Sequence, residues 1–332
     1  MEAIHTDHKD FKTLWQKGEK LSPGTTFFYT DAFHQWNQKI YSYQTDDTFV
    51  VVSPSKEILA LVPLYTFQEN GKTFYARGPG YMRAPLFFCP FSSNHFNRVA
   101  TFVFEHIKEC AQKHSVHAHR LGIEAIELLE GRLYFNVLMD YGYKPEYGVT
   151  NIIDTRLKPE ELWTNLRKSY HRLINKAKKS FHVKIVDSQH FDFDLCEEYR
   201  KLHHLAAGRD TRPVESFHVM YAIIKENKAF LVLVFDADGK ARGAHFFLYN
   251  GIYAYSGSAA NDPSLDSLSG VGHLAVWEGV LCAQRLGCHF LDQGPLMHQR
   301  GEASSEKEIN IDYFKQGFGG ERVVIFRGIL EF

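Results

Sequence analysis

Positive charge gathers in one stretch of the sequence, residues 156–184. This stretch holds nine Lys and Arg side chains against two Glu, an excess of seven, in a chain whose net charge is −1. Arg167, Arg172 and Lys176 lie away from the apolar stripe of the helix expected there. A basic wall of this kind suits the phosphates of a donor or acceptor substrate. A solvated helix face explains the same charges equally well.

A glycine-containing loop, residues 267–273, opens an expected helix. Gly270 and Gly272 would let backbone N–H groups approach an anion such as a pyrophosphate at the positive end of that helix. Ordinary capping by a serine of the loop explains the same residues. Both interpretations stay open.

Two further segments place polar residues and glycines where an open sheet would expose them. Asp292-Gln293-Gly294-Pro295 ends an expected strand with a carboxylate. Residues 310–320 hold aromatic side chains, one lysine and three glycines, and fit neither a regular helix nor a regular strand. This second segment has no ordinary structural explanation and is therefore a candidate for function.

Histidines do not form a recognisable metal motif. His114, His117 and His119 lie close together in the sequence, but no Cys or carboxylate accompanies them in a known zinc spacing. Since the chain has 18 histidines, chance explains this grouping and no metal site is predicted. P-loop, HExxH, GxSxG and Rossmann motifs are also absent from the sequence.

The elements that must position these residues occur twice. Residues 49–78 and 230–257 share one order, in which an apolar run turns into an alternating strand and then, at Asn70-Gly71 or Asn250-Gly251, into a third strand. A helix and a further strand are expected after each meander, over 95–114 and 120–128 in the first half and over 271–287 and 288–292 in the second. This order predicts a duplicated unit.

The expected fold is α+β, with helices flanking a mostly antiparallel sheet in each half. We expect one domain over residues 1–148 and a second over 149–332. The second half adds expected helices over 160–180, 194–207 and 215–226.

Composition limits the class of protein. A chain of 332 residues exceeds the ~250 residues at which single cores stop growing. Its 44% hydrophobic and 23% charged residues describe a folded rather than a disordered chain. Because 38 Lys and Arg balance 39 Asp and Glu, generic coating of nucleic acid is disfavoured. The absence of a signal-peptide pattern and of CxxC spacing among the five cysteines favours a cytoplasmic protein.

The sequence resembles FemAB-type transferases over most of its length. The resemblance lies in LWTNLRKSYHRLINKAKKSFHVKIV, ARGAHFFLYNGIYAYSGSAANDPS, LDQGP and FKQGFGGE in the second half, and in TFFYTDAFHQWNQ and ILALVPLY in the first. It implies two tandem GNAT-like (acyl-CoA N-acyltransferase) domains with a cleft between them. It also implies transfer of an acyl or aminoacyl group onto an amine, since characterised members use aminoacyl-tRNA and many relatives look acyl-CoA-dependent.

The resemblance also assigns roles to residues. By the family's motif, Lys315 stabilises the oxyanion that forms when an amine attacks an ester or thioester, and the ring of Phe314 helps to hold its ammonium group. His245 and Asp292 are the candidate general bases. The expected substrate- and phosphate-binding residues are Arg83, Arg167, Arg172, Lys176, Gly270, Gly272 and Tyr313.

Substrates and partners follow from the same resemblance. No tightly bound cofactor is expected; acyl-CoA or aminoacyl-tRNA is the expected co-substrate. The expected acceptor is the amine of a cell-envelope precursor, either an amino sugar or a peptidoglycan peptide, at a cytoplasmic site or at the inner face of the membrane. Ser267 stands where Gln or Arg usually begins the pyrophosphate loop of simple acetyltransferases. The coiled-coil arm of some tRNA-dependent members is also absent, so both donors stay open.

The alternative function is a catalytically silent module that binds an anionic glycan or nucleotide. DNA is not an expected partner.

Overall fold

A computed structural model of the chain describes residues 1–21, 26–41, 43, 45–91, 93–297 and 305–332. The chain forms two compact units, one of residues 1–148 with 324–332 and one of residues 149–323. From the sequence, residues 324–332 belong to the second domain; in the structure they cluster with the first unit. The reason is that β15 (Glu321–Glu331) pairs antiparallel with β8 (Ala118–Gly122) through Arg327–Glu331.

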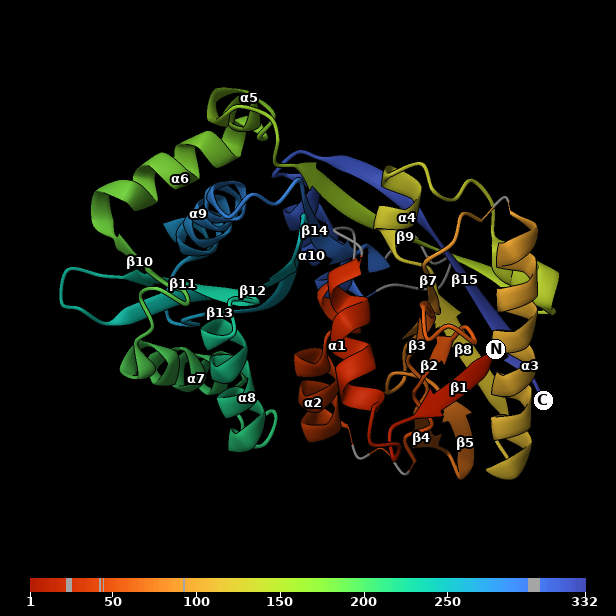
Figure 1. Cartoon of the computed structure of the whole chain (residues 1–332). Helices are drawn as coiled ribbons and strands as arrows, with labels where there is room; N and C mark the ends of the chain where they lie inside the picture. The colour runs from red at the N-terminus through yellow and green to blue at the C-terminus, as the bar shows by residue number, and fades with distance from the viewer. Residues whose placement is uncertain (22–25, 42, 44, 92, 298–304) are drawn as a thin grey trace. The chain divides into compact units, whose positions relative to one another are not determined.

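The first unit contains two sheets and the helices that cover them (Figure 1). One sheet has the strand order β1-β2-β3-β7, and the other runs β15-β8-β5-β4 with β6 beside β8. Its remaining elements are β1 (Glu2–His5), α1 (Phe11–Leu21), α2 (Asp31–Ile40), β2 (Phe49–Val52), β3 (Ile58–Val62), β4 (Thr66–Glu69), β5 (Lys72–Tyr75), β6 (Met82–Arg83), β7 (Leu86–Phe87), α3 (Asn94–Lys113) and α4 (Ala125–Leu129).

The first predicted meander is divided between these two sheets. Its second strand, expected to end at Leu64-Tyr65, already ends as β3 at Val62, and the chain then forms a separate strand, β4, which pairs with β5 instead of β2. Pro63 lies at the break and has no backbone N–H group to continue the ladder. The strand expected over 120–128 is also shorter than predicted: β8 ends at Gly122, and Ala125–Leu129 is helical.

Helix α3 supplies much of the core of the first unit. The side chain of Ser93 caps its first turn by accepting a hydrogen bond from the backbone N–H of Phe96. Val99, Val103 and Ile107 then repeat at helical spacing and are fully buried. They pack in one cluster with side chains of β2, β3, β5 and β8.

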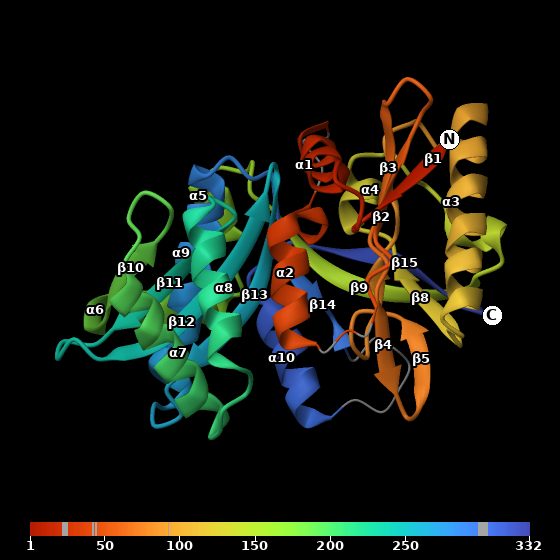
Figure 2. The same cartoon turned by 60° about the horizontal axis from the view of Figure 1, so that its bottom comes forward.

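The second unit has helices on both faces of a sheet with the order β10-β11-β12-β13-β14-β9. Figures 1 and 2 show α6 and α9 on one face and α7 and α8 on the other. Its elements are β9 (Lys144–Asp154), α5 (Pro159–Thr164), α6 (Lys168–Ser180), β10 (His182–Val186), α7 (Phe193–Ala207), α8 (Val214–Lys225), β11 (Ala229–Phe235), β12 (Ala241–Asn250), β13 (Tyr253–Asn261), α9 (Val271–Arg285), β14 (Phe290–Pro295) and α10 (Glu306–Gln316).

Both units repeat a strand–helix–strand arrangement. In the first, the connection from β5 to β8 contains β6, β7 and α3, and β5 and β8 pair in parallel. In the second, α9 connects β13 to β14, which also pair in parallel. The other pairs in each unit's sheets are antiparallel, apart from β6 with β8. This confirms the predicted mostly antiparallel α+β fold, with its repeated helix and following strand.

Two predictions about the second unit were wrong in detail. The helix expected over 160–180 is broken at Arg167, whose backbone is not helical (ψ 137°) and whose N–H group donates to the carbonyl oxygen of Gly317, 2.9 Å away. Residues 310–316 form the last part of a regular helix, α10, although the sequence predicted neither a regular helix nor a regular strand there. Ser305 and Glu308 form a capping box that starts this helix.

Candidate functional site

The candidate site lies where β13 and β14 separate. These strands pair in parallel over only three positions, from Tyr253–Phe290 to Tyr255–Asp292. Beyond them β13 stays paired with β12, through a bulge between Phe246 and Phe247, whereas Pro295 of β14 pairs with β9. Backbone groups at the ends of two diverging parallel strands are left without a shared ladder, which makes this point a natural place for a ligand.

Lys315 brings a positive charge to this point. Its Nζ donates a hydrogen bond to the carbonyl oxygen of Pro295 at 2.8 Å. Gly294 has a φ of +81°, and a Cβ atom built there would lie 3.1 Å from the hydroxyl of Tyr255 and 3.6 Å from Nζ of Lys315. The ammonium group and the tyrosine hydroxyl therefore lie around one backbone position.

The side chain of Lys315 is partly buried. Burial lowers the pKa of Lys315, and the negative charges of Asp312 and Asp292 oppose that shift. A buried ammonium group interacts more strongly with a developing negative charge than an exposed one, because less solvent screens it. Lys315 is therefore suited chemically to the role that the sequence predicts for it.

Asp292 holds the turn after the paired part of β14. Its Oδ1 accepts hydrogen bonds from the hydroxyl of Thr150 and, at 2.7 Å, from the backbone N–H of Gly294. Its Oδ2 accepts from the hydroxyl of Tyr253 at 2.7 Å. Because three donors already occupy this buried carboxylate, the geometry favours a role in shaping the turn over the predicted alternative of general base.

His245 is buried on β12 and faces β13. Its Nε2 lies 2.7 Å from the hydroxyl oxygen of Ser256, and its ring stacks on Phe247 with centroids 4.3 Å apart. Burial, together with the positive charge of Lys315, lowers the pKa of His245 to about 3. The ring is therefore neutral at pH 7 and is a weak base, although it lies near enough to Lys315 to feel its charge.

The glycines that follow Lys315 fit a tight turn against the start of α6. A Cβ atom on Gly317 would lie 2.2 Å from the ring of Tyr170, and one on Gly320 would lie 2.4 Å from the carbonyl oxygen of Ile152. Gly320 also has a φ of +88°. These glycines let the end of α10 dock closely, which sets the direction in which α10 presents Lys315.

Phe314 belongs to an aromatic cluster rather than to a cation–π pair. Its ring lies 5.0 Å from His273 and 5.1 Å from Phe318, and its carbonyl oxygen accepts a hydrogen bond from Tyr170. Within the described part of the chain, the cation–π contacts do not join Phe314 to Lys315. Phe314 anchors the helix that carries Lys315 instead of contacting its ammonium group.

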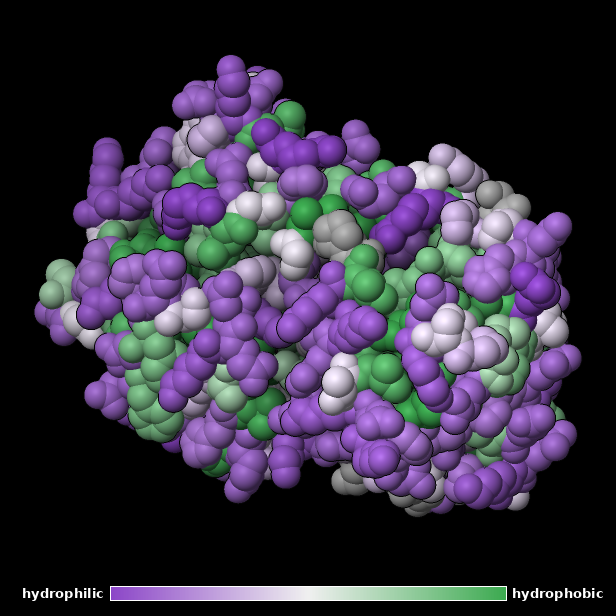
Figure 3. Space-filling model, viewed as in Figure 1, coloured by the Kyte–Doolittle hydropathy of each residue, from purple (hydrophilic) through white to green (hydrophobic). Residues whose placement is uncertain are grey.

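The three predicted phosphate-binding side chains of the basic stretch do not gather in one place. The guanidinium group of Arg167 lies 3.5 Å above the ring of Tyr313, beside α10. Lys176 follows Arg167 by nine residues, which is about 13 Å along the helix. Its Nζ donates a hydrogen bond to the carbonyl oxygen of Leu268 at 3.0 Å. Arg172 lies between them and is exposed. The surface over α5 and α6 is mainly hydrophilic (Figure 3).

The glycines of the 267–273 loop are explained by close packing. Gly270 has a φ of +79°, and a Cβ atom there would lie 2.3 Å from the carbonyl oxygen of Leu173. A Cβ atom on Gly272 would lie 2.8 Å from the side chain of Asn261. The start of α9 therefore requires small residues to pack against α6 and β13, whether or not an anion binds there.

The comparisons with known proteins concern the fold. No protein-family model and no curated protein sequence matches the chain. Among solved structures, that of FemX matches 99% of this chain and 98% of its own with a TM-score of 0.71 at 13% identity. L-PGS from Bacillus licheniformis matches over 85% and 83% with a TM-score of 0.56 at 11% identity. A tandem GNAT protein from the clavulanic acid biosynthesis pathway matches over 99% and 98% with a TM-score of 0.53 at 12% identity.

The chain has a FemAB-like tandem GNAT fold. The resemblance inferred from the sequence motifs is thus confirmed at the level of the fold. Among the described residues, no helix of this tandem GNAT fold is long and apolar enough to cross a membrane.

In the first unit of the tandem GNAT fold, Arg83 takes part in a buried ion pair. Its Nε lies 2.5 Å from Oε1 of Glu124, and its guanidinium group lies 3.8 Å above the ring of Phe28. The side chain is only 18% exposed. This arrangement favours a packing role for Arg83 within its unit over the predicted contact with substrate.

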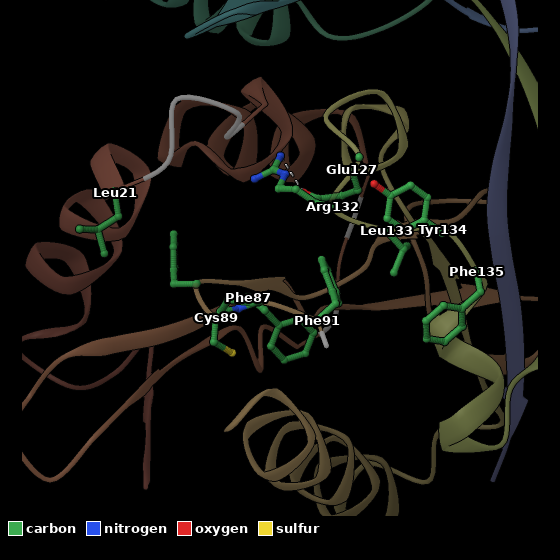
Figure 4. A pocket seen from close by; sticks show the side chains of 12 residues that line it. Leu21, Phe87, Cys89, Phe91, Glu127, Arg132, Leu133, Tyr134 and Phe135 are labelled. Atoms are coloured by element: carbon green, nitrogen blue, oxygen red, sulfur yellow. Dashed lines mark ion pairs between the residues drawn. The ribbon is translucent and has the colours of Figure 1, made fainter. Parts of the chain in front are cut away.

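The first unit also holds a cavity of about 560 Å³ (Figure 4). Its walls are mostly apolar and include Phe87, Phe91 and Leu133, with the Arg132–Glu127 ion pair on one side. The volume suits a small organic molecule. Sequence reasoning did not identify it, because its walls come from α1, the segment after β7 and the segment after α4.

Two residues of the site were also missed. Tyr255 and Ser256 lie next to the bulge of β13, and the signal for that bulge was Gly257 inside an otherwise regular strand. Ser256 contacts His245, whereas the position of Tyr255 near Lys315 depends on the turn at Gly294, which brings together segments distant in the sequence.

Proposed function

We propose that the chain is an acyltransferase that forms an amide between an activated acyl or aminoacyl donor and an amine acceptor. The observation that carries this proposal is the place of the Lys315 ammonium group, beside Gly294 and Tyr255 where β13 and β14 separate. The tandem GNAT fold, which this chain shares with FemX and a tandem GNAT protein, supports the same class of reaction.

The proposed reaction uses charge stabilisation and orientation. The nitrogen of the acceptor amine attacks the carbonyl carbon of the donor, and negative charge builds on the carbonyl oxygen. Lys315 stabilises that oxyanion, with Tyr255 as a second nearby donor. When the oxyanion collapses, the C–N bond is kept and the C–S or C–O bond to the donor's leaving group breaks. The amine proton passes to the leaving group or to solvent.

Among the residues that the structure describes, neither predicted candidate is a strong general base for this reaction. The neutral ring of His245 has a pKa of about 3, and Asp292 already accepts three hydrogen bonds. We therefore propose that the acceptor enters as a neutral amine. Rate then comes from orientation and from the electrostatic effect of Lys315.

The proposed donors carry phosphates. The basic residues of α6 and of its N-cap are suited to bind them. Arg167 lies beside α10 and Lys176 beside the loop before α9, so an extended phosphate-bearing donor could meet both ends of the helix. We propose acyl-CoA or aminoacyl-tRNA as donor and the amine of an envelope precursor as acceptor. All five cysteines are free thiols, which suits the cytoplasm, where these donors are used.

The experiment first separates the donors and then looks for product. Acetyl-CoA and an aminoacyl-tRNA are titrated calorimetrically into the full chain, and the donor that binds is incubated with amino sugars and with a peptidoglycan peptide. We expect an acceptor whose mass increases by one acyl or aminoacyl group. Binding of an anionic glycan with no product from either donor would instead support the silent binding module.

A further inference from the structure

Three potential metal ligands meet in the first unit, away from the site described above. Nε2 of His5 on β1 lies 2.8 Å from Nε2 of His106 on α3. Sγ of Cys110, one helical turn beyond His106, lies 3.9 Å from the same nitrogen. All three ligand atoms lie within 4.8 Å of one another.

This spacing is close to that of a tetrahedral zinc ion. With Zn–N near 2.0–2.1 Å and Zn–S near 2.3 Å, tetrahedral ligand atoms lie about 3.3–3.6 Å apart. The two nitrogens would need to separate by about half an ångström, and Sγ of Cys110 would need to approach Nε2 of His106 by a similar amount. Sγ of Cys110 and Nε2 of His5 lie within 4.8 Å of each other and would need to approach by up to about 1.2 Å.

The hydrogen bonds around the two histidines orient them as ligands. Nδ1 of His106 lies 3.0 Å from Oε2 of Glu109, so that nitrogen is the donor and Nε2 carries a lone pair. Nε2 of His5 is turned toward the same space, because it lies 2.8 Å from Nε2 of His106.

The two Nε2 atoms share a hydrogen bond of 2.8 Å. With Nδ1 of His106 acting as a donor to Glu109, Nε2 of His5 donates and Nε2 of His106 accepts. A metal ion at this point would take the place of the shared proton, and the proton of His5 would move to its Nδ1. The surroundings suit a cation, because the carboxylate of Asp47 is close enough to interact with both His5 and Cys110.

We propose that His5, His106 and Cys110 bind one Zn²⁺ ion, with water as the fourth ligand. Two imidazoles and a thiolate form a donor set that zinc prefers. On binding, the Cys110 thiol releases its proton to solvent and the sulfur joins the metal as thiolate. The ion links the N-terminal strand β1 to α3, so it stabilises the first unit. This site is independent of the proposed acyl transfer.

Cobalt(II) tests the site directly, because its spectrum reports the ligands. The full chain is stripped of metal with a chelator under reducing conditions, and Co²⁺ is then titrated. We expect one equivalent to bind, with a thiolate-to-cobalt charge-transfer band in the near ultraviolet and the intense visible bands of a four-coordinate ion. Added Zn²⁺ should remove both. A wild-type chain that shows no saturable binding overturns the proposal, and the two rings then simply share a proton.

Variants identify the ligands. Cys110→Ser should lose the charge-transfer band, whereas Cys89→Ser, a second thiol of the same unit, should keep it. Glu109→Ala changes a side chain that is 73% exposed, so the fold should survive. Loss of its hydrogen bond to His106 should weaken metal binding by about 10- to 100-fold. A band that survives in Cys110→Ser, or an unchanged affinity in Glu109→Ala, contradicts the assignment.

Discussion

The Nζ atom of Lys315 donates a hydrogen bond to the carbonyl oxygen of Pro295, 2.8 Å away. This bond joins α10 to the end of β14, where β14 has left β13. A single backbone carbonyl only partly satisfies an ammonium group that has three donors. Lys315 is thus held in place while it keeps donors for the oxygen of a substrate.

The carboxylate of Asp292 should be needed for the turn that positions Pro295. Asp292→Asn replaces an acceptor of three hydrogen bonds with an amide whose NH₂ group faces existing donors. We expect the free energy of unfolding to fall by roughly 3 kcal/mol, measured by urea denaturation. Asp238→Asn, in an exposed turn, is the matched control and should change stability little. Equal stability of both variants would show that the Asp292 network does not hold the turn.

Close approach of backbones at Gly320 should make that glycine irreplaceable. A Cβ atom there would lie 2.4 Å from a carbonyl oxygen, whereas Gly239 has a similar positive φ and a Cβ atom at that position would meet no atom within 4 Å. Gly239→Ala should therefore cost about 1 kcal/mol, from φ alone. Gly320→Ala should cost roughly 3 kcal/mol because the backbone must also shift. Denaturation midpoints that fall equally would refute the packing argument.

Burial of His245 should make the protein less stable in acid. The pKa of His245 is about 3, below the ordinary value of about 6.5. Between these values the unfolded state binds the proton and the folded state does not, so stability falls as pH drops from about 6.5 toward 3. At pH 4 the loss from this group approaches about 3 kcal/mol.

His245→Asn should reduce this dependence. Between pH 6 and 4, the slope of unfolding free energy against pH should become smaller by about 1.4 kcal/mol per pH unit. The measurement is a series of urea denaturation curves at different pH values. An unchanged slope would mean that the ring is already protonated in the folded protein.

Arg167 should contribute to donor binding more than its neighbours on the basic helix. Arg167→Ala removes a guanidinium group held against Tyr313 beside α10. We expect the affinity for the phosphate-bearing donor to fall by about 10- to 100-fold, the scale of a charged hydrogen bond. Lys179→Ala removes an exposed charge from the last turn of α6 and is the matched control. If both variants lost the same affinity for the donor, and salt abolished both losses, Arg167 would contribute only general electrostatic attraction of the donor.

Periodicity and turn chemistry predicted most of the second unit. Asn250-Gly251 marked the hairpin between β12 and β13, and the apolar spacing after residue 271 marked α9. The prediction for the first meander was wrong at Pro63, because proline has no backbone N–H group to continue the strand pairing. This local effect outweighed the similarity to the second meander. The helix in the 310–320 segment was not predicted, because its capping box, Ser305 and Glu308, lies before the part that contains the glycines.

The site was less predictable because tertiary contacts define it. Lys315 and Asp292 were selected from sequence motifs, but their relation to Tyr255 depends on the separation of two strands. Spacing along the chain also could not reveal the proposed metal ligands. His5 and His106 are 101 residues apart in the sequence and meet only when β1 packs near α3.

The rate of amide formation in Lys315→Met tests the central proposal most directly. It is measured in single turnover with saturating donor and acceptor, beside wild type and Lys307→Met, which removes an exposed lysine of the same helix. We predict a loss of about 100-fold or more for Lys315→Met, the scale of one oxyanion donor, with Lys307→Met close to wild type. A Lys315→Met protein that stays folded and transfers the acyl group at the wild-type rate would contradict the proposal.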